Sequence, residues 1–192
     1  MKWVVLVIVV SLGAYTYLTL HYRKESPAFR PYQDSKNRAG VMRLLSAGFQ
    51  RVTLTAQRPA DGAGVPEGAK SVATAGGLPA ELRSTLLDLP LLPASITRVA
   101  AAASVSALLA YPIQFTCALA DNKRQLSGAE LYVKDNTLTL VPTFERLDGE
   151  LLARNRESVV HLSIPAGALK PGTYKVTLVG ETASRTWTLQ VN

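Results

Sequence analysis

The sequence predicts a mainly β domain, a β-sandwich with one or two short helices, that follows a single N-terminal transmembrane helix. Three observations lead to this fold class: an apolar run at the N-terminus, a middle region rich in glycine and proline, and a C-terminal part in which apolar and polar residues alternate. Alternation with a period of two places the apolar side chains of a strand on one face, which a sandwich buries between two sheets.

The composition shifts along the chain and predicts four segments. These are a transmembrane anchor (1–22), a basic juxtamembrane tether with a short helix and a first strand (23–57), a Gly/Pro-rich loop with short helical segments (58–110), and the β-sandwich core (111–192).

The anchor is predicted from an apolar run, Trp3 to Leu20, that contains no charged residue. A helix rises about 1.5 Å per residue, so about 20 residues cross a hydrocarbon core of about 30 Å. Aromatic residues at both ends of the run and two cations beyond it are typical of membrane interfaces. The predicted anchor residues are Trp3, Tyr15, Tyr17, Tyr22, Arg23 and Lys24. Cleavage as a signal peptide, after Ser11-Leu12-Gly13 and before Ala14, is the alternative to an uncleaved span.

The formal net charge of +7 is concentrated near the anchor. Residues 1–60 contain nine Lys or Arg against two acids, whereas residues 111–192 contain nine against eight. A nucleic-acid binder carries its basic stripe on the folded domain. We therefore expect the basic tether to lie against anionic lipid head groups, and we expect no nucleic-acid partner.

The tether and loop contain three short elements with recognisable patterns. Residues 38–49 place apolar side chains on one helical face, and the helix is expected either to lie on the membrane or to pack on the domain. Residues 50–57 alternate as a half-buried strand. Glycine and proline are dense in 58–79, where one brief strand is expected at 71–75, and a short helix comes next over 79–89. Residues 95–110 leave helix and strand open, because alanines favour the first and alternation favours the second.

From residue 111 onwards the pattern is steadily that of strands and turns. Asp135-Asn136 and Lys170-Pro171-Gly172 are typical turns, and Pro142 is expected to end a strand or mark an edge. The expected strands cover residues 113–119, 129–134, 137–141, 158–164, 174–179 and 184–191.

The C-terminal third of the chain resembles a known architecture. The stretch from Leu162 through Leu169 and the Pro-Gly turn to Tyr174, followed by the strand containing Trp187, is similar to the last strands of immunoglobulin-like or fibronectin type III-like sandwiches in single-span bacterial envelope proteins. The resemblance implies an immunoglobulin-like sandwich with Leu162, Leu169, Tyr174 and Trp187 in its core. It implies no activity, because many functions share this architecture.

Two arguments predict opposite orientations of the transmembrane helix. The positive-inside rule places the five cations between residues 23 and 38, and with them the domain, in the cytoplasm. An N-terminal anchor with a head of two residues ordinarily exports the domain attached to its C-terminal end, and modules of the resembled kind are usually extracytoplasmic. We expect an extracytoplasmic C-terminal domain.

Residues suited to catalysis or metal binding are scattered. The single cysteine, Cys117, lies in an apolar run and is expected to be a small core residue. His21 is expected at the bilayer edge, and His161 on the solvated face of a strand. Four carboxylates are interleaved with arginines near one hairpin and predict a salt-bridged surface, not a calcium or acid/base site: Glu145, Asp148, Glu150 and Glu157.

These patterns predict a protein that is not an enzyme and needs no cofactor or metal. The function expected first is a membrane-tethered structural or protein-interaction accessory in the bacterial cell envelope, with the lipid bilayer and another envelope protein as partners. The alternative is an extracytoplasmic small-ligand-binding module that uses the loop 58–79 as the lip of a pocket. The remote alternative is a hydrolase, for which no Gly-x-Ser-x-Gly motif is present.

Overall fold

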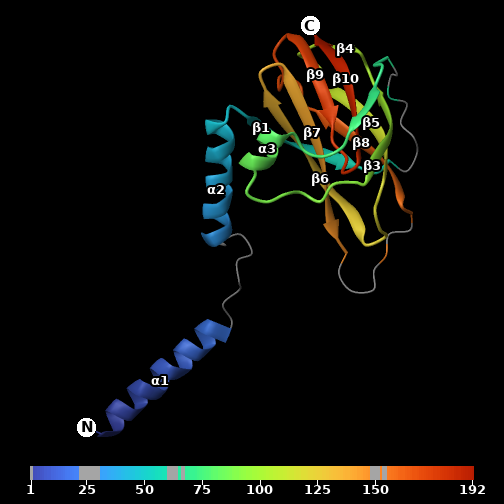
Figure 1. The fold of residues 1–192 in the computed structure, drawn as a ribbon. Coiled ribbons are helices and arrows are strands. Elements are labelled where there is room, and N and C mark those ends of the chain that lie inside the picture. The colour runs from blue at the N-terminus through green and yellow to red at the C-terminus, as the bar shows by residue number, and fades with distance from the viewer. Residues whose placement is uncertain (1, 22–30, 60–64, 66–67, 148–151, 153–154) are drawn as a thin grey trace. The chain divides into compact units, whose positions relative to one another are not determined.

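The computed structural model describes residues 2–21, 31–59, 65, 68–147, 152 and 155–192 (Figure 1). The chain divides into two compact units, Met1–Asn37 and Arg38–Asn192. Its helices are α1 (Lys2–His21), α2 (Pro31–Ser46) and α3 (Ala80–Thr85). Its strands are β1 (Gln50–Gln57), β2 (Val72–Ala75), β3 (Ser95–Ala101), β4 (Ser104–Val105), β5 (Tyr111–Ala118), β6 (Arg124–Lys134), β7 (Thr137–Arg146), β8 (Glu157–Ile164), β9 (Gly172–Leu178) and β10 (Ala183–Val191).

The second unit is built around a closed eight-stranded β-barrel. Around the ring the strands lie in the order β10-β3-β5-β8-β1-β6-β7-β9, and β9 pairs with β10 to close it. The pairs β7–β9 and β3–β10 are parallel, and the other ring pairs are antiparallel. Strand accounts for 46% of the structure, which confirms the mainly β prediction.

The predicted sandwich is wrong, and with it the immunoglobulin-like fold that the resemblance implied. In the barrel, β9 bonds to β7 on one side and to β10 on the other, so the last strands join the two ends of a single curved sheet. Alternation within a strand shows which face is buried, and this pattern is the same in a sandwich and in a barrel. Whether the strands form a sandwich or a barrel depends on which distant strands pair, and the alternation pattern does not carry that information.

The seam between β3 and β10 is the weakest joint of the ring. Only one backbone pair, Ala183 with Ser95, is formed there. Beyond that pair the Arg185 guanidinium donates hydrogen bonds to the carbonyl oxygens of Thr97 (2.6 Å) and Ile96 (3.4 Å). β2 and β4 also pair with β10, outside the ring. The side chain of Arg185 therefore satisfies carbonyls that strand pairing leaves open.

The main core fills the inside of the barrel. All ring strands contribute buried apolar side chains, and β5 shows the strict alternation of buried and half-buried residues that the sequence predicts for a strand. The four residues expected in the core are buried: Leu162, Leu169, Tyr174 and Trp187.

A second, smaller core lies outside the barrel wall. Outward-facing residues of β6 and β7 pack with α3 and with the last turns of α2. Its buried members are Leu44, Phe49, Leu82, Tyr132, Val141 and Val179. This cluster attaches α3 and the C-terminal part of α2 to the barrel.

Several helices and strands have bounds close to those predicted from the sequence. β1 has the predicted bounds, and the open segment at 95–110 forms strands β3 and β4. Helix α2 begins at Pro31, because proline fits the first turn of a helix. Pro142 lies inside β7, where pairing with β6 continues to Arg146 but pairing with β9 has ended at Leu140, so its missing N–H breaks no ladder.

Candidate functional site

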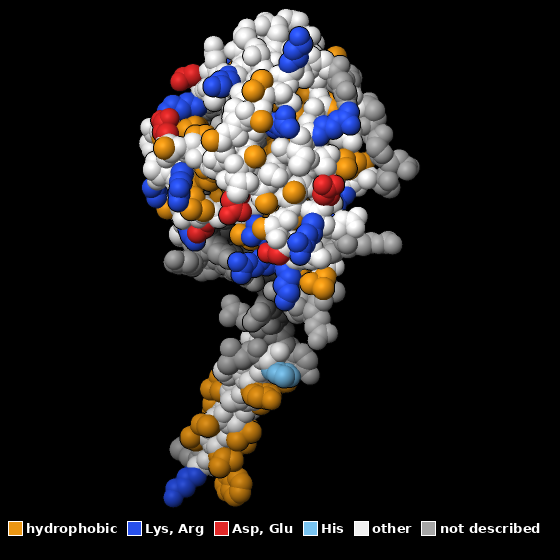
Figure 2. All heavy atoms as spheres, turned by 45° about the vertical axis from the view of Figure 1, so that its right-hand side comes forward, with side chains coloured by type: hydrophobic (Ala, Val, Ile, Leu, Met, Phe, Trp, Pro, Cys, Tyr) orange, Lys and Arg blue, Asp and Glu red, His pale blue; other side chains and the backbone are white. Residues whose placement is uncertain are grey.

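Helix α1 is exposed along its whole described length. Its segment Lys2–Thr19 is long and apolar enough to cross a membrane, a test that a signal sequence also passes, and none of that segment is buried. Figure 2 shows apolar side chains along its visible face. Trp3, Tyr15 and Tyr17 are exposed, and the Tyr17 ring stacks on His21 with centroids 5.7 Å apart. The other predicted anchor residues, Tyr22, Arg23 and Lys24, lie outside the described residues.

Cys117 lies inside the barrel core. Its side chain is fully buried, and its sulfur lies 3.5 Å from the carbonyl oxygen of Ser158. Burial raises the pKa of the thiol to about 12, so the reactive thiolate does not form at neutral pH.

His161 is more enclosed than its strand pattern predicts. Its imidazole is half-buried on β8, and its buried Nδ1 has no hydrogen-bond partner among the described residues. Strands β5 and β1 flank it, where Gln114 and Gln57 are its register partners.

The four carboxylates do not form a described site. Glu145 accepts a hydrogen bond from Gln125 (2.5 Å), and Glu157 is exposed at the start of β8. Asp148 and Glu150 lie outside the described residues. Among the residues that the structure describes, no group of three or more His, Cys, Asp or Glu side chains could hold a metal ion.

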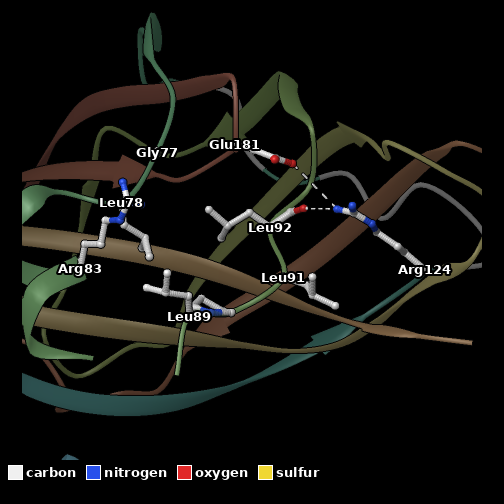
Figure 3. Close-up of a pocket in the computed structure, with 9 residues that line it drawn as sticks. Gly77, Leu78, Arg83, Leu89, Leu91, Leu92, Arg124 and Glu181 are labelled. Carbon is white, nitrogen blue, oxygen red and sulfur yellow. Dashed lines mark hydrogen bonds and ion pairs between the residues drawn. The ribbon is translucent and has the colours of Figure 1, made fainter. Parts of the chain in front are cut away.

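A pocket of about 370 Å³ opens beside α3, between connecting segments that lie outside the barrel (Figure 3). We call it the leucine pocket. It is lined by Gly77, Leu78, Arg83, Leu89, Pro90, Leu91, Leu92, Arg124 and Glu181. Its volume falls within the range of about 300–1,000 Å³ that small-molecule sites occupy.

Two connecting segments wall the pocket, and backbone hydrogen bonds hold both. The segment after α3 contains prolines at 90 and 93, and it is held to β7 by the bond from Phe144 N to Leu91 O (3.0 Å). The segment before α3 is held to the β9–β10 turn by bonds from Gly76 N to Thr182 O (3.1 Å) and from Gly77 N to Gly180 O (2.8 Å). The walls are therefore preformed.

Gly76 fits a place that no side chain can occupy. A Cβ atom at this position would lie 2.3 Å from the carbonyl carbon of Thr182 and 2.5 Å from the carbonyl oxygen of Glu181. The contacts are with backbone atoms, which cannot swing aside. Close approach of these two segments therefore requires glycine here.

Arg124 ties three segments together at one end of the pocket. Its Nη1 donates to the carbonyl oxygen of Leu92 (3.0 Å) and lies 3.9 Å from Glu181 Oε2, while its Nε donates to Asp121 Oδ2 (3.3 Å). Figure 3 shows the guanidinium turned toward Leu92 and Glu181. The side chain is only 13% exposed, so the bond to Leu92 is partly shielded from water.

The charges around the pocket are mixed. Arg83, which is exposed on α3, and Arg124 contribute two cations, and Glu181 contributes one anion. The walls between them are leucine and proline. Because Arg124 is already paired with Asp121 and Glu181, this arrangement fits a ligand or partner side chain with an apolar body and an anionic end that reaches Arg83.

A second, more open groove of about 620 Å³ runs over the outer face of β2, β10 and β9. Threonines line much of it, and Lys70 and Lys175 are its charged residues. Hydroxyl contacts between Thr74 and Thr186 and between Thr186 and Thr177, each 3.4 Å, cross the strands. Val72, Tyr174 and Trp187 also line the groove, so its lining mixes hydroxyl, apolar and basic groups.

No protein-family profile, no curated protein and no solved structure matches this chain. Reasoning from the sequence made the loop 58–79 the lip of a possible pocket, but of that loop only Gly77 and Leu78 line the leucine pocket, and its other lining residues were missed. The signal available was the density of leucine and proline over residues 86–93, which is too apolar for an ordinary surface loop. Nothing in the sequence distinguishes Arg124 from the other arginines.

Proposed function

We propose that the chain is a membrane-tethered, non-catalytic binding module of the bacterial cell envelope, an accessory that binds another envelope protein through the leucine pocket. The observation that carries the proposal is the fully exposed apolar helix α1 in the same chain as a domain with a preformed pocket. A large exposed apolar helix needs a lipid or protein environment to be stable. A pocket lined by leucines accepts an apolar side chain as an anchor of binding.

The membrane tether is tested by extraction of membranes that contain the full chain. Washing with alkaline carbonate should leave the protein in the membrane fraction, and detergent should release it. Release by carbonate alone would contradict the tether. A reporter fused after Asn192 then determines the side of the membrane, which we propose to be extracytoplasmic.

Partner binding is tested by a photo-crosslinking residue placed at Arg83, on the rim of the pocket. In intact cells it should join the chain to one reproducible envelope protein. The matched control places the same crosslinker at Leu108, which is 83% exposed and does not line the pocket. Leu89→Glu should abolish the crosslink at Arg83, because it puts a charge on the apolar wall. Equal crosslinks from both positions, or none from Arg83, would contradict the proposal.

A second function is favoured by the volume of the pocket. A space of about 370 Å³ holds about twelve groups the size of a water molecule, which suits a small amphiphile. The exposed cation Arg83 at the rim favours an anionic one. Mass spectrometry of small molecules that co-purify with the wild-type chain, compared with Leu89→Glu, tests this alternative, and an identical set of molecules would exclude it.

A further inference from the structure

We propose that the outward face of helix α2, formed by Val41, Met42 and Leu45 with Arg38 among them, docks onto an anionic phospholipid surface. This inference rests on the membrane tether of the proposed function. It adds a second membrane contact, made by the domain unit itself, that would hold the barrel close to the bilayer.

Helix α2 has two apolar faces within residues 38–46. One face packs against the domain: Leu44 is buried in the outer core, and Gly40 lies against Leu87, whose Cδ1 would be 3.5 Å from an added Cβ. Arg43 Nη2 donates a hydrogen bond to the carbonyl oxygen of Ser84 (2.9 Å) and fixes the helix in this position. The second face therefore cannot turn inward without breaking the first.

The second face presents three large apolar side chains to solvent. Val41 is 43% exposed, Met42 68% and Leu45 58%. Val41 and Leu45 are one helical turn apart, and Met42 is adjacent, so the three form one patch. Single exposed apolar residues are ordinary, but a patch on a helix beside basic residues is typical of interfacial helices.

The positive charge of the helix favours an anionic lipid surface over a second copy of the chain as the binding partner of this face. Arg38 lies four residues before Met42 and three before Val41, so it belongs to the same face. The sequence of α2 contains Lys36, Arg38 and Arg43 but one acid, Asp34. Arginine keeps its charged end at the lipid phosphates while its stem covers apolar surface. The combination fits an anionic lipid surface, which attracts cations and accepts apolar side chains beneath its head groups.

The length of chain between α1 and this face limits how far apart the two can lie. Nine residues, 22–30, separate α1 from α2 and span at most about 30 Å. The ten helical residues of α2 that precede Val41 add about 15 Å. A short tether gives an effective concentration in the millimolar range. Three side chains and one arginine are a weak binding surface by themselves, but at that concentration weak binding is enough.

The test uses the full chain with Met42→Cys, labelled with an environment-sensitive fluorophore. Cys117 is fully buried, so the label attaches to the new cysteine alone. The protein is reconstituted into nanodiscs of phosphatidylcholine, with or without phosphatidylglycerol, some of which carry a lipid-attached quencher. The control position is Thr188→Cys, which is exposed on the outer face of β10. Incorporation into nanodiscs reports the tether, so its failure is distinguished from failure of docking.

We expect the label at Met42 to shift to the blue and to be quenched in nanodiscs with phosphatidylglycerol, and the label at Thr188 to do neither. Arg38→Glu should lower the ratio of docked to free domain by at least about fivefold, which corresponds to the attraction of one cation to an anionic leaflet. Leu45→Ser should lower it as well, and high salt should act like Arg38→Glu. These positions are exposed, so the variants should unfold as the wild type does.

Three results would overturn the proposal. The first is equal behaviour of the labels at Met42 and Thr188 in nanodiscs that contain phosphatidylglycerol. The second is an equal shift with and without phosphatidylglycerol. The third is a shift that depends on protein concentration in detergent without lipid, which would assign the face to a second copy of the chain.

Discussion

The indole Nε1 of Trp187 donates a hydrogen bond to the Tyr111 hydroxyl, at 3.2 Å, inside the barrel. Tyr111 in turn donates to the carbonyl oxygen of Ala102 at 2.7 Å. Both aromatic side chains are almost completely buried. The chain of bonds connects β10, β5 and the link between β3 and β4, so it crosses the sparsely paired β3–β10 seam of the ring.

Tyr111→Phe should lower the free energy of unfolding by about 1–3 kcal/mol. The substitution keeps the ring but leaves the buried Trp187 N–H without a partner, and it also removes the part-buried bond to the Ala102 carbonyl. Denaturant unfolding of the detergent-solubilised chain measures the change. The control is Tyr174→Phe, whose hydroxyl donates to Lys170 O (3.0 Å) near exposed residues, where water can replace it. Equal losses from both substitutions would contradict the role of the buried bond chain.

Gly76→Ala should lower the free energy of unfolding by about 2–3 kcal/mol, because its Cβ would overlap the backbone of the β9–β10 turn. Gly128→Ala is the matched control. Its Cβ would meet only Thr143 Oγ1, at 3.6 Å, so the expected change is within about 0.5 kcal/mol. Denaturant midpoints at constant m-value measure both. A neutral Gly76→Ala would show that the two segments are not held as closely as the backbone bonds indicate.

The stability of the domain should fall as the pH rises from 9 to 12. Burial raises the pKa of the Cys117 thiol from 9.0 to about 12, and burial likewise raises the pKa of Tyr111 from 10.0 to about 12. Over this range the unfolded chain releases protons that the folded chain retains, so the stabilisation is complete below pH 9 and is lost as pH approaches 12.

Cys117→Ala isolates the contribution of the thiol to this pH dependence. The wild-type free energy of unfolding should fall more steeply than that of the variant, by at most about 1.4 kcal/mol per pH unit. Unfolding curves at several pH values between 8 and 12 measure the two slopes. Parallel curves would show that the thiol is not desolvated in the folded chain.

The sequence contains the strands but not their arrangement. The residues of β1 and β5 carry a period-two pattern that depends only on neighbours along the chain, and both strands lie where the pattern places them. The parallel pair β7–β9 joins residues 137–140 to 175–178, across a stretch that includes β8. No local pattern encodes such a pairing, so a sandwich and a barrel are equally compatible with the alternation.

For the leucine pocket too, the sequence indicates features that depend on neighbouring residues but not the contacts between distant segments. Leu89 and Leu91 could be seen as unusually apolar for a connection between elements. Arg124, which holds that segment, is more than 30 residues away along the chain. Its role becomes visible only in the structure, where it donates a hydrogen bond to the carbonyl oxygen of Leu92. The sequence could predict α1 from composition alone, because a long helix that is apolar on every face has no polar face to turn toward water and suits a membrane span.

We expect Arg124 to maintain the shape of the leucine pocket by holding the segment after α3 in place. Arg124→Lys keeps the charge but cannot bond Leu92 and Asp121 simultaneously, because a lysine ammonium lacks the planar fork of a guanidinium. We expect both Arg124→Lys and Arg124→Ala to loosen the segment after α3, with a loss of about 1–3 kcal/mol for Ala. Glu181 contributes little to this loss, since it is 57% exposed and its oxygen lies 3.9 Å away.

Hydrogen exchange of the backbone amides in residues 86–94 measures this loosening directly. Both Arg124 variants should exchange faster there than the wild type, and the crosslink from the pocket rim should weaken in parallel. Arg83→Ala is the matched control: it removes a cation of the same pocket from an exposed position on α3 and should leave exchange in 86–94 unchanged. If Arg124→Lys exchanged as slowly as the wild type, the charge alone would be sufficient and the bond to Leu92 O would not shape the pocket.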